Sequence, residues 1–200
     1  MNQKTTQTSI SKQLHKLTTA LLFSLLSLTT VSADELTTLT TVCAACHGAN
    51  GISNAPVFPN LAGQQSIYMA DQIKAMKAGI RKNSLMEAVI KDLSDQQIDA
   101  LAEYYSSLPA STTAVSAVNQ LGKNVRALCI SCHGVKGISV NAQWPNLAGQ
   151  KQQYLQQQLL AFRDDSRFGP NMQVIAKELN VEQIAAVAEY FSQQPGANHE

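Results

Sequence analysis

Residues 43–47 read CAACH, and residues 129–133 read CISCH. From Cys43 to Tyr105 the chain aligns with itself without a gap at a constant offset of 86 residues, so one module is present twice. The spacing Cys-x-x-Cys-His is the attachment signature of c-type haem, in which two thiols become thioethers to the porphyrin and the adjacent histidine ligates the iron. The sequence therefore predicts two covalently bound haem c groups, one in each module.

Each motif supplies two cysteines and one histidine. The expected covalent haem sites are Cys43, Cys46, Cys129 and Cys132, and the expected proximal iron ligands are His47 and His133. A disulfide in each cysteine pair is a common fate of exported cysteines, but it explains neither the adjacent histidines nor the repeat. A zinc site is also disfavoured, because each cluster lacks further ligands at structural spacing.

A second identical segment follows each motif. PNLAGQ begins twelve residues after each histidine and occupies residues 59–64 and 145–150. A ligating imidazole must donate its other N–H to an acceptor, and we expect the carbonyl groups of Pro59 and Pro145 to accept it. Leu61 and Leu147 are expected to pack on the haem. A simple turn would account for the proline and the glycine, but not for identity over six residues.

The sixth iron ligand separates an electron carrier from a catalyst with an open iron. The two remaining histidines lie in the N-terminal segment and in the C-terminal tail, so methionine is the expected donor. The second module has one methionine, Met172, and the offset maps it onto Met86. Met69 and Met76 map onto residues of other types, so we expect them to be core residues.

The N-terminal segment, residues 1–33, has the pattern of a secretory signal peptide. Three lysines precede an apolar run from Leu17 to Val31, which ends in small residues. The run is interrupted by threonine and serine and is short for a bilayer crossing, which favours a cleaved signal over an anchor. We therefore expect a periplasmic mature chain that begins at Asp34.

Charge limits the classes of partner. Removal of the signal takes away three of the 15 Lys and Arg and none of the 14 Asp and Glu, which leaves a net charge of −2. No basic run accompanies this balance, so nucleic acid is not an expected partner. The first half is acidic, with five basic and eight acidic residues in 34–106, whereas residues 118–200 carry seven basic and six acidic residues. We expect unequal haem potentials from this asymmetry.

Apolar residues in both halves recur with helical rather than alternating spacing, which predicts an all-α fold. We expect a first domain at 34–106, a linker at 107–117 and a second domain at 118–200. Each domain has only about eighty residues, so its own apolar core is small and a bound haem would complete it. Helices are expected at about 66–78 and 152–162 and, with capping residues at Ser94 and Asn180, at the end of each half.

These motifs resemble the class I cytochromes c, specifically the dihaem cytochrome c4 type. The resemblance covers the mature chain through CxxCHG, PNLAGQ, the later methionine and the terminal AEY helix of both halves. It implies two tandem all-α domains whose haems are ligated by His47 with Met86 and by His133 with Met172. It also implies a periplasmic electron carrier that associates peripherally with the membrane and donates to a redox protein such as a membrane-bound terminal oxidase or reductase.

Matched polar residues are further candidates for contact with the haem. Arg81 and Arg167 precede each methionine by five residues, and they would pair with haem propionates or remain as solvated surface cations. The matched pairs Tyr68 with Tyr154 and Gln72 with Gln158 would hydrogen-bond haem edges or pack. One departure is visible at the distal ligand: proline precedes Met172 in the second module but not Met86 in the first. We expect Met86 to be the weaker ligand, because its loop is less restrained.

Two other functions remain open at this stage. The chain could be the cytochrome subunit of a redox enzyme complex, such as a flavoprotein dehydrogenase, which the sequence does not separate from a soluble carrier. A dihaem peroxidase would need one iron able to bind substrate, and the methionine at the same position in both modules argues against it.

Overall fold

The computed structural model of the chain describes residues 31–112 and 119–196, and within them every regular element is helical. The first module contains α2 (Ala33–His47), α3 (Ser66–Lys77), α4 (Ser84–Ile90) and α5 (Asp95–Ser107). The second contains α6 (Gln120–Val125), the 3-10 turn η1 (Arg126–Leu128), α7 (Ile130–His133), α8 (Gln152–Arg163), α9 (Pro170–Lys177) and α10 (Val181–Ser192). The all-α prediction is confirmed. The expected signal lies outside the described residues, apart from residues 31–33.

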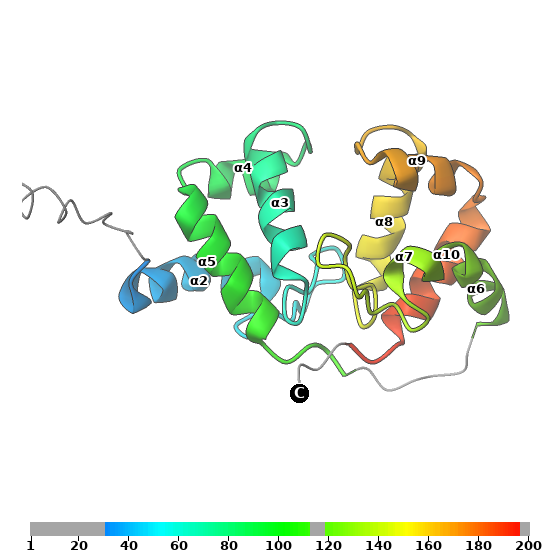
Figure 1. Ribbon diagram of the computed structural model, residues 1–200, viewed down its shortest axis with the longest axis horizontal. Helices are drawn as coiled ribbons and strands as arrows, with labels where there is room; N and C mark the ends of the chain where they lie inside the picture. Colours follow the sequence, from blue (N-terminus) through cyan, green and yellow to red (C-terminus); the bar gives the residue numbers. More distant parts are fainter. Residues whose placement is uncertain (1–30, 113–118, 197–200) are drawn as a thin grey trace, which may run out of the picture. The chain divides into compact units, whose positions relative to one another are not determined.

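The core of each module lies between two long helices. α3 packs against α5 in the first module and α8 against α10 in the second, as Figure 1 shows. Apolar residues on α5 recur at helical spacing, and Ile98 at the centre of this face is fully buried, as is its counterpart Ile184 on α10. Tyr105 and Phe191 occupy matched positions near the ends of α5 and α10, and both are 2% exposed.

The starts of these two core helices follow the expected caps. The side chain of Ser94 accepts from the backbone N–H of Gln97, and Gln97 returns a hydrogen bond to the backbone N–H of Ser94. Asn180 and Gln183 form the same reciprocal pair at the start of α10. Two donors that the helix itself leaves unpaired are thereby satisfied at each start, which fixes where the chain enters the helix.

The two modules differ in the helix that leads to the attachment motif. α2 runs without a break to His47, whereas the second module covers the same ground with α6, η1 and α7. Gly122 on α6 lies against the backbone of α10: a Cβ there would be 2.1 Å from the carbonyl oxygen of Ala186. The first module has Leu36 at the matched position, so this close approach of α6 is specific to the second module.

The described part of the expected linker is extended rather than helical. α5 ends at Ser107, and residues 108–112 contain no helix. Ala110 is buried, and the Ser111 carbonyl accepts from the backbone N–H of Gly196 at 3.0 Å. The first half of the linker therefore packs against the end of the second module. In 31–112 and 119–196 there is no helix with the length and apolarity needed to cross a bilayer.

Candidate haem sites

The four motif cysteines lie at the ends of the helices that lead into each site. Cys43 and Cys46 are on the last turns of α2. In the second module, Cys129 is the N-cap residue of α7, and Cys132 lies within that helix. All four lie in the described part of the chain as free, partly exposed thiols, so neither pair forms a disulfide. Burial raises the pKa of the Cys43 thiol, and it raises the pKa of Cys129 to about 11. Both thiols are therefore protonated at neutral pH.

Each histidine is buried and held by the carbonyl group that the sequence predicted. His47 Nδ1 lies 2.8 Å from the Pro59 carbonyl oxygen, and His133 Nδ1 lies 2.9 Å from that of Pro145. Burial lowers the pKa of both imidazoles, against the opposing effect of this hydrogen bond. A neutral imidazole that donates from Nδ1 leaves Nε2 as an electron pair donor, the form that a metal requires. The predicted acceptors are confirmed.

A glycine directly after each histidine turns the chain back. Gly48 and Gly134 have φ values of 82° and 78°, which L side chains rarely adopt. A Cβ at either residue would lie 2.1 Å from a carbonyl oxygen, that of Ile52 or Ile138. The loop that carries the proline carbonyl can fold under the imidazole only because this position has no side chain.

The methionines separate into two environments. Met69 and Met76 lie on α3 and are 6% exposed, which confirms that they are core residues. Met86 on α4 and Met172 on α9 are only partly buried, at matched places in the two modules. The helix starts differ: the Asn83 side chain caps α4 by accepting from the backbone N–H of Met86, whereas α9 begins at Pro170 without a side-chain cap.

The PNLAGQ segments also join the two modules, which the sequence analysis missed. Gln150 Oε1 accepts from the backbone N–H of Asn60 at 2.7 Å, and Gln150 Nε2 donates to the Asn60 carbonyl at 2.9 Å. Asn60 Nδ2 donates to the Gly149 carbonyl at 2.9 Å. The same three bonds recur at the same distances with the modules exchanged, from Gln64, Asn146 and Gly63. All six are buried.

This interface is connected to the haem-binding motifs. Asn60 Oδ1 accepts from the backbone N–H of Ser53, and the Ser53 hydroxyl donates to the Cys46 carbonyl at 2.9 Å. Asn60 therefore connects its own attachment loop to the other module, directly beside the Pro59 carbonyl that holds His47. The identity of the two segments was the sequence signal for this interface. Buried asparagine and glutamine side chains need hydrogen-bond partners, and two identical polar segments can provide partners for one another.

Arg81 and Arg167 lie in a second cluster between the modules. Arg81 donates to Gln72 Oε1 in its own module and to the Tyr154 hydroxyl and Gln158 Oε1 in the other, at 2.9–3.1 Å. Arg167 makes the reciprocal contacts, with the Tyr68 hydroxyl and with both glutamines, at 2.7–3.0 Å. Arg167 is 7% exposed. Neither arginine is a solvated surface cation. The tyrosines and glutamines accept hydrogen bonds from the arginine of the other module.

The arginine cluster fits the prosthetic group that the motifs imply. Among the described residues, neither guanidinium group forms an ion pair. Buried cations without a counter-ion are costly, so the cluster calls for anions from outside the chain, and haem propionates have that chemistry. Burial would raise the pKa of Tyr154, but the adjacent Arg81 and Arg167 outweigh it and lower that pKa. The direction of this shift reflects the two positive charges beside the phenol.

Comparison with known proteins identifies two cytochrome c domains in the chain. The family model for cytochrome c matches the chain twice, over residues 36–109 and 120–195. The thiosulfate dehydrogenase electron acceptor of Thiomonas intermedia (strain K12) is 37% identical over 169 residues, which cover 76% of this chain and 77% of that protein. Cytochrome c4 of Pseudomonas aeruginosa is 34% identical over 163 residues, which cover 74% of this chain and 81% of the relative.

A solved cytochrome c4 structure has a similar fold. Reduced recombinant cytochrome c4 from Pseudomonas stutzeri matches with a TM-score of 0.75 at 31% identity, over 82% of this chain and 98% of that one. Two cytochrome c domains with two attachment motifs correspond to two covalent haem c groups, and the partners of such a protein are other redox proteins. The chain belongs to the cytochrome c family and is a dihaem electron-transfer protein similar to cytochrome c4.

Proposed function

We propose that both irons are closed by one histidine and one methionine, and that the chain is a carrier for this reason. The pairs are His47 with Met86 and His133 with Met172, and the four motif cysteines form the thioether bonds. One observation carries the proposal: in both modules the imidazole is buried and its Nδ1 is held by a proline carbonyl, which leaves Nε2 for the iron. The matched methionine then completes each site.

Haem would supply reversible one-electron chemistry at its iron, and the protein residues would fix the ligands and the charge around it. The proline carbonyls fix the ring orientation of each histidine and make it a better donor. Arg81 and Arg167 place positive charge where the propionates would lie, which favours the ferrous form. A site that keeps both axial ligands in both oxidation states offers no position for a substrate.

The proposed organisation has two domains, 34–106 and 118–200, joined by a linker at 107–117. The matched family-model segments and the extended residues 108–112 support this division. The proposed location is the periplasm, because residues 1–33 have a signal-peptide pattern and covalent haem attachment needs reduced cysteines in an exported chain. Membrane association would be peripheral.

The proposed partners are a respiratory donor and a terminal oxidase or reductase. A second candidate is favoured by a specific observation: relatives 37% and 36% identical to this chain are named thiosulfate dehydrogenase electron acceptors. The chain would then receive electrons from a thiosulfate-oxidising enzyme, either as a soluble carrier or as the cytochrome subunit of that complex.

Stopped-flow mixing separates these two partners. The oxidised holoprotein is mixed with thiosulfate and a thiosulfate dehydrogenase, and haem reduction is followed by absorbance; thiosulfate without enzyme is the control. The reduced protein is mixed with oxidase-containing membranes, and reoxidation is followed. Fast enzyme-dependent reduction supports the dehydrogenase as donor, and fast reoxidation supports the oxidase as acceptor. Failure of both reactions would contradict the carrier proposal.

A further inference from the structure

Asp165 follows α8 in a backbone conformation that disfavours a side chain. Its φ is 62°, and it is the only residue other than glycine with a positive φ in the described part of the chain. The first module has Gly79 at the matched position, with a φ of 71°. Aspartate adopts this conformation more readily than most side chains, but at a steric cost that glycine does not have and that an interaction of its carboxylate can offset.

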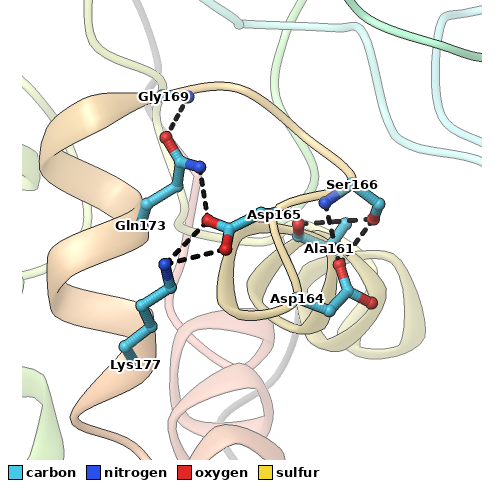
Figure 2. A network of polar contacts seen from close by, with 7 residues as sticks. All are labelled: Ala161, Asp164, Asp165, Ser166, Gly169, Gln173 and Lys177. Carbon is cyan, nitrogen blue, oxygen red and sulfur yellow. Dashed lines mark hydrogen bonds and ion pairs between the residues drawn. The ribbon is translucent and has the colours of Figure 1, made fainter.

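The Asp165 carboxylate makes that interaction with α9, the helix that carries Met172. It accepts from Gln173 Nε2 at 2.6 Å and from Lys177 Nζ at 2.8 Å, and both contacts are drawn in Figure 2. Gln173 Oε1 in turn accepts from the backbone N–H of Gly169, three residues before the methionine. We call Asp165, Gln173 and Lys177 the brace. It ties the end of α8 to both turns of α9.

The neighbouring aspartate does not take part. Asp164 accepts from the backbone N–H and the hydroxyl of Ser166, so its hydrogen bonds stay within the turn that follows α8 (Figure 2). It has no hydrogen bond to α9. Asp164 therefore provides a matched control, with the same charge one residue away.

The first module has a lysine in place but no brace. Lys91 corresponds to Lys177, but its carboxylate contact is to the adjacent Asp92, at 3.9 Å. Gln173 is replaced by Glu87, whose Oε1 accepts from the backbone N–H of Asn83. Gly79 offers no side chain, and a Cβ there would meet nothing within 4 Å. Among the described residues, no carboxylate of the first module joins the end of α3 to α4 as Asp165 joins the end of α8 to α9. Two other side chains connect these segments: Arg81 donates to Gln72 on α3, and Lys77 at the end of α3 donates to the carbonyl group of Leu93 beyond α4.

We propose that Asp165 is a positioning residue that keeps Met172 on the iron of the second haem, and that the first haem, without a brace, releases Met86 more readily. The inference rests on the proposed ligation by methionine. It predicts that an exogenous ligand competes with methionine unequally at the two haems. It also predicts that removing the brace from the second module, or building it in the first, changes the competition at that haem alone.

The inference is tested by imidazole titration of the oxidised holoprotein at constant ionic strength, which measures the imidazole concentration that displaces each methionine. NMR resonances of the axial methionine methyl groups report each haem separately. Asp165→Gly copies the first module and should lower the imidazole concentration for half-displacement of Met172 by about threefold to tenfold, the range expected for a partly exposed ionic network. The value for the first haem should not change.

The reciprocal variant combines Gly79→Asp with Glu87→Gln and uses Lys91 as it stands. It should raise the imidazole concentration needed at the first haem by a similar factor, because it builds the brace in the open space beside Gly79. Asp164→Ala is the control, and it should leave both haems unchanged.

Three results would overturn the inference: equal competition at the two wild-type haems, no difference between Asp165→Gly and Asp164→Ala, or an equal effect of Asp165→Gly on both haems. Failure of the underlying proposal is visible separately. If Met172 were not a ligand, the wild-type protein would lack a methionine resonance from the second haem before any variant was made.

Discussion

Arg81 and Arg167 place two positive charges between the modules, and Arg167 is buried whereas Arg81 is partly buried. Each donates to glutamine side chains of both modules and to a tyrosine of the other module, and neither forms an ion pair in the part of the chain that the structure describes. Uncharged acceptors satisfy the N–H groups but leave the net charge in place. In the proposed arrangement, the propionates of both haems would pair with this charge, and one side chain would then influence both irons.

Arg167→Met tests this electrostatic role. Removing a cation near the haems should lower both reduction potentials by several tens of millivolts, because the positive charge stabilises the ferrous form. Spectroelectrochemical titration measures the change. Arg163→Met, near the end of α8 but outside the cluster, removes the same charge and should have a smaller effect. Equal shifts from the two variants would show that only net charge matters.

At the scale of helices, the modules differ most where α6 meets α10. The backbone at Gly122 lies so close to Ala186 that no other residue fits without movement. The helix cannot remain at this distance if a side chain is added, and the attachment motif follows directly through η1 and α7. We therefore expect the packing of this glycine to affect the position of the second attachment motif.

Gly122→Ala tests this close approach. The added methyl group should destabilise the holoprotein by about 1–3 kcal/mol, the usual cost of overpacking, although alanine favours helix. Chemical denaturation followed by circular dichroism gives the difference in free energy of unfolding. Lys123→Ala, at an exposed position of the same helix, is the control and should change stability little. A neutral or stabilising Gly122→Ala would contradict the described packing.

The helices themselves could largely be predicted from the sequence. The capping pairs at Ser94 and Asn180 and the apolar spacing placed α5 and α10, because these signals are local. The division of the second module's first helix into α6, η1 and α7 could not be predicted, since it depends on packing against α10, far along the chain. The brace at Asp165 was missed for the same reason: its partners lie on the next helix.

At the scale of the whole molecule, the repeated segment PNLAGQ has two roles within this chain. Its proline carbonyl holds the histidine, which could be predicted because a ligating imidazole needs an acceptor. Its asparagine and glutamine join the modules, which sequence reasoning could not place without knowing which surfaces meet. The six buried hydrogen bonds connect the segments that hold His47 and His133 to the other module.

Gln150→Ala tests the energetic role of this interface. It leaves the backbone N–H of Asn60 buried without its acceptor, so the free energy of unfolding should fall by about 1–3 kcal/mol. Gln64→Ala should have the same effect by the same reasoning, since its contacts are equivalent. Gln153→Ala, exposed on α8, is the control. Stability equal to that of the control in both interface variants would show that these bonds do not hold the modules together.

The most direct test of the account is carbon monoxide binding to the untouched, fully reduced holoprotein, with covalent haem counted per chain. The account predicts two haems per chain and no binding, because a methionine occupies the sixth position of each iron. Met172→Ala should then bind carbon monoxide at one haem, whereas Met69→Leu in the core should bind none. Ready binding by the wild-type protein, or high-spin ferric iron at either site, would contradict the account.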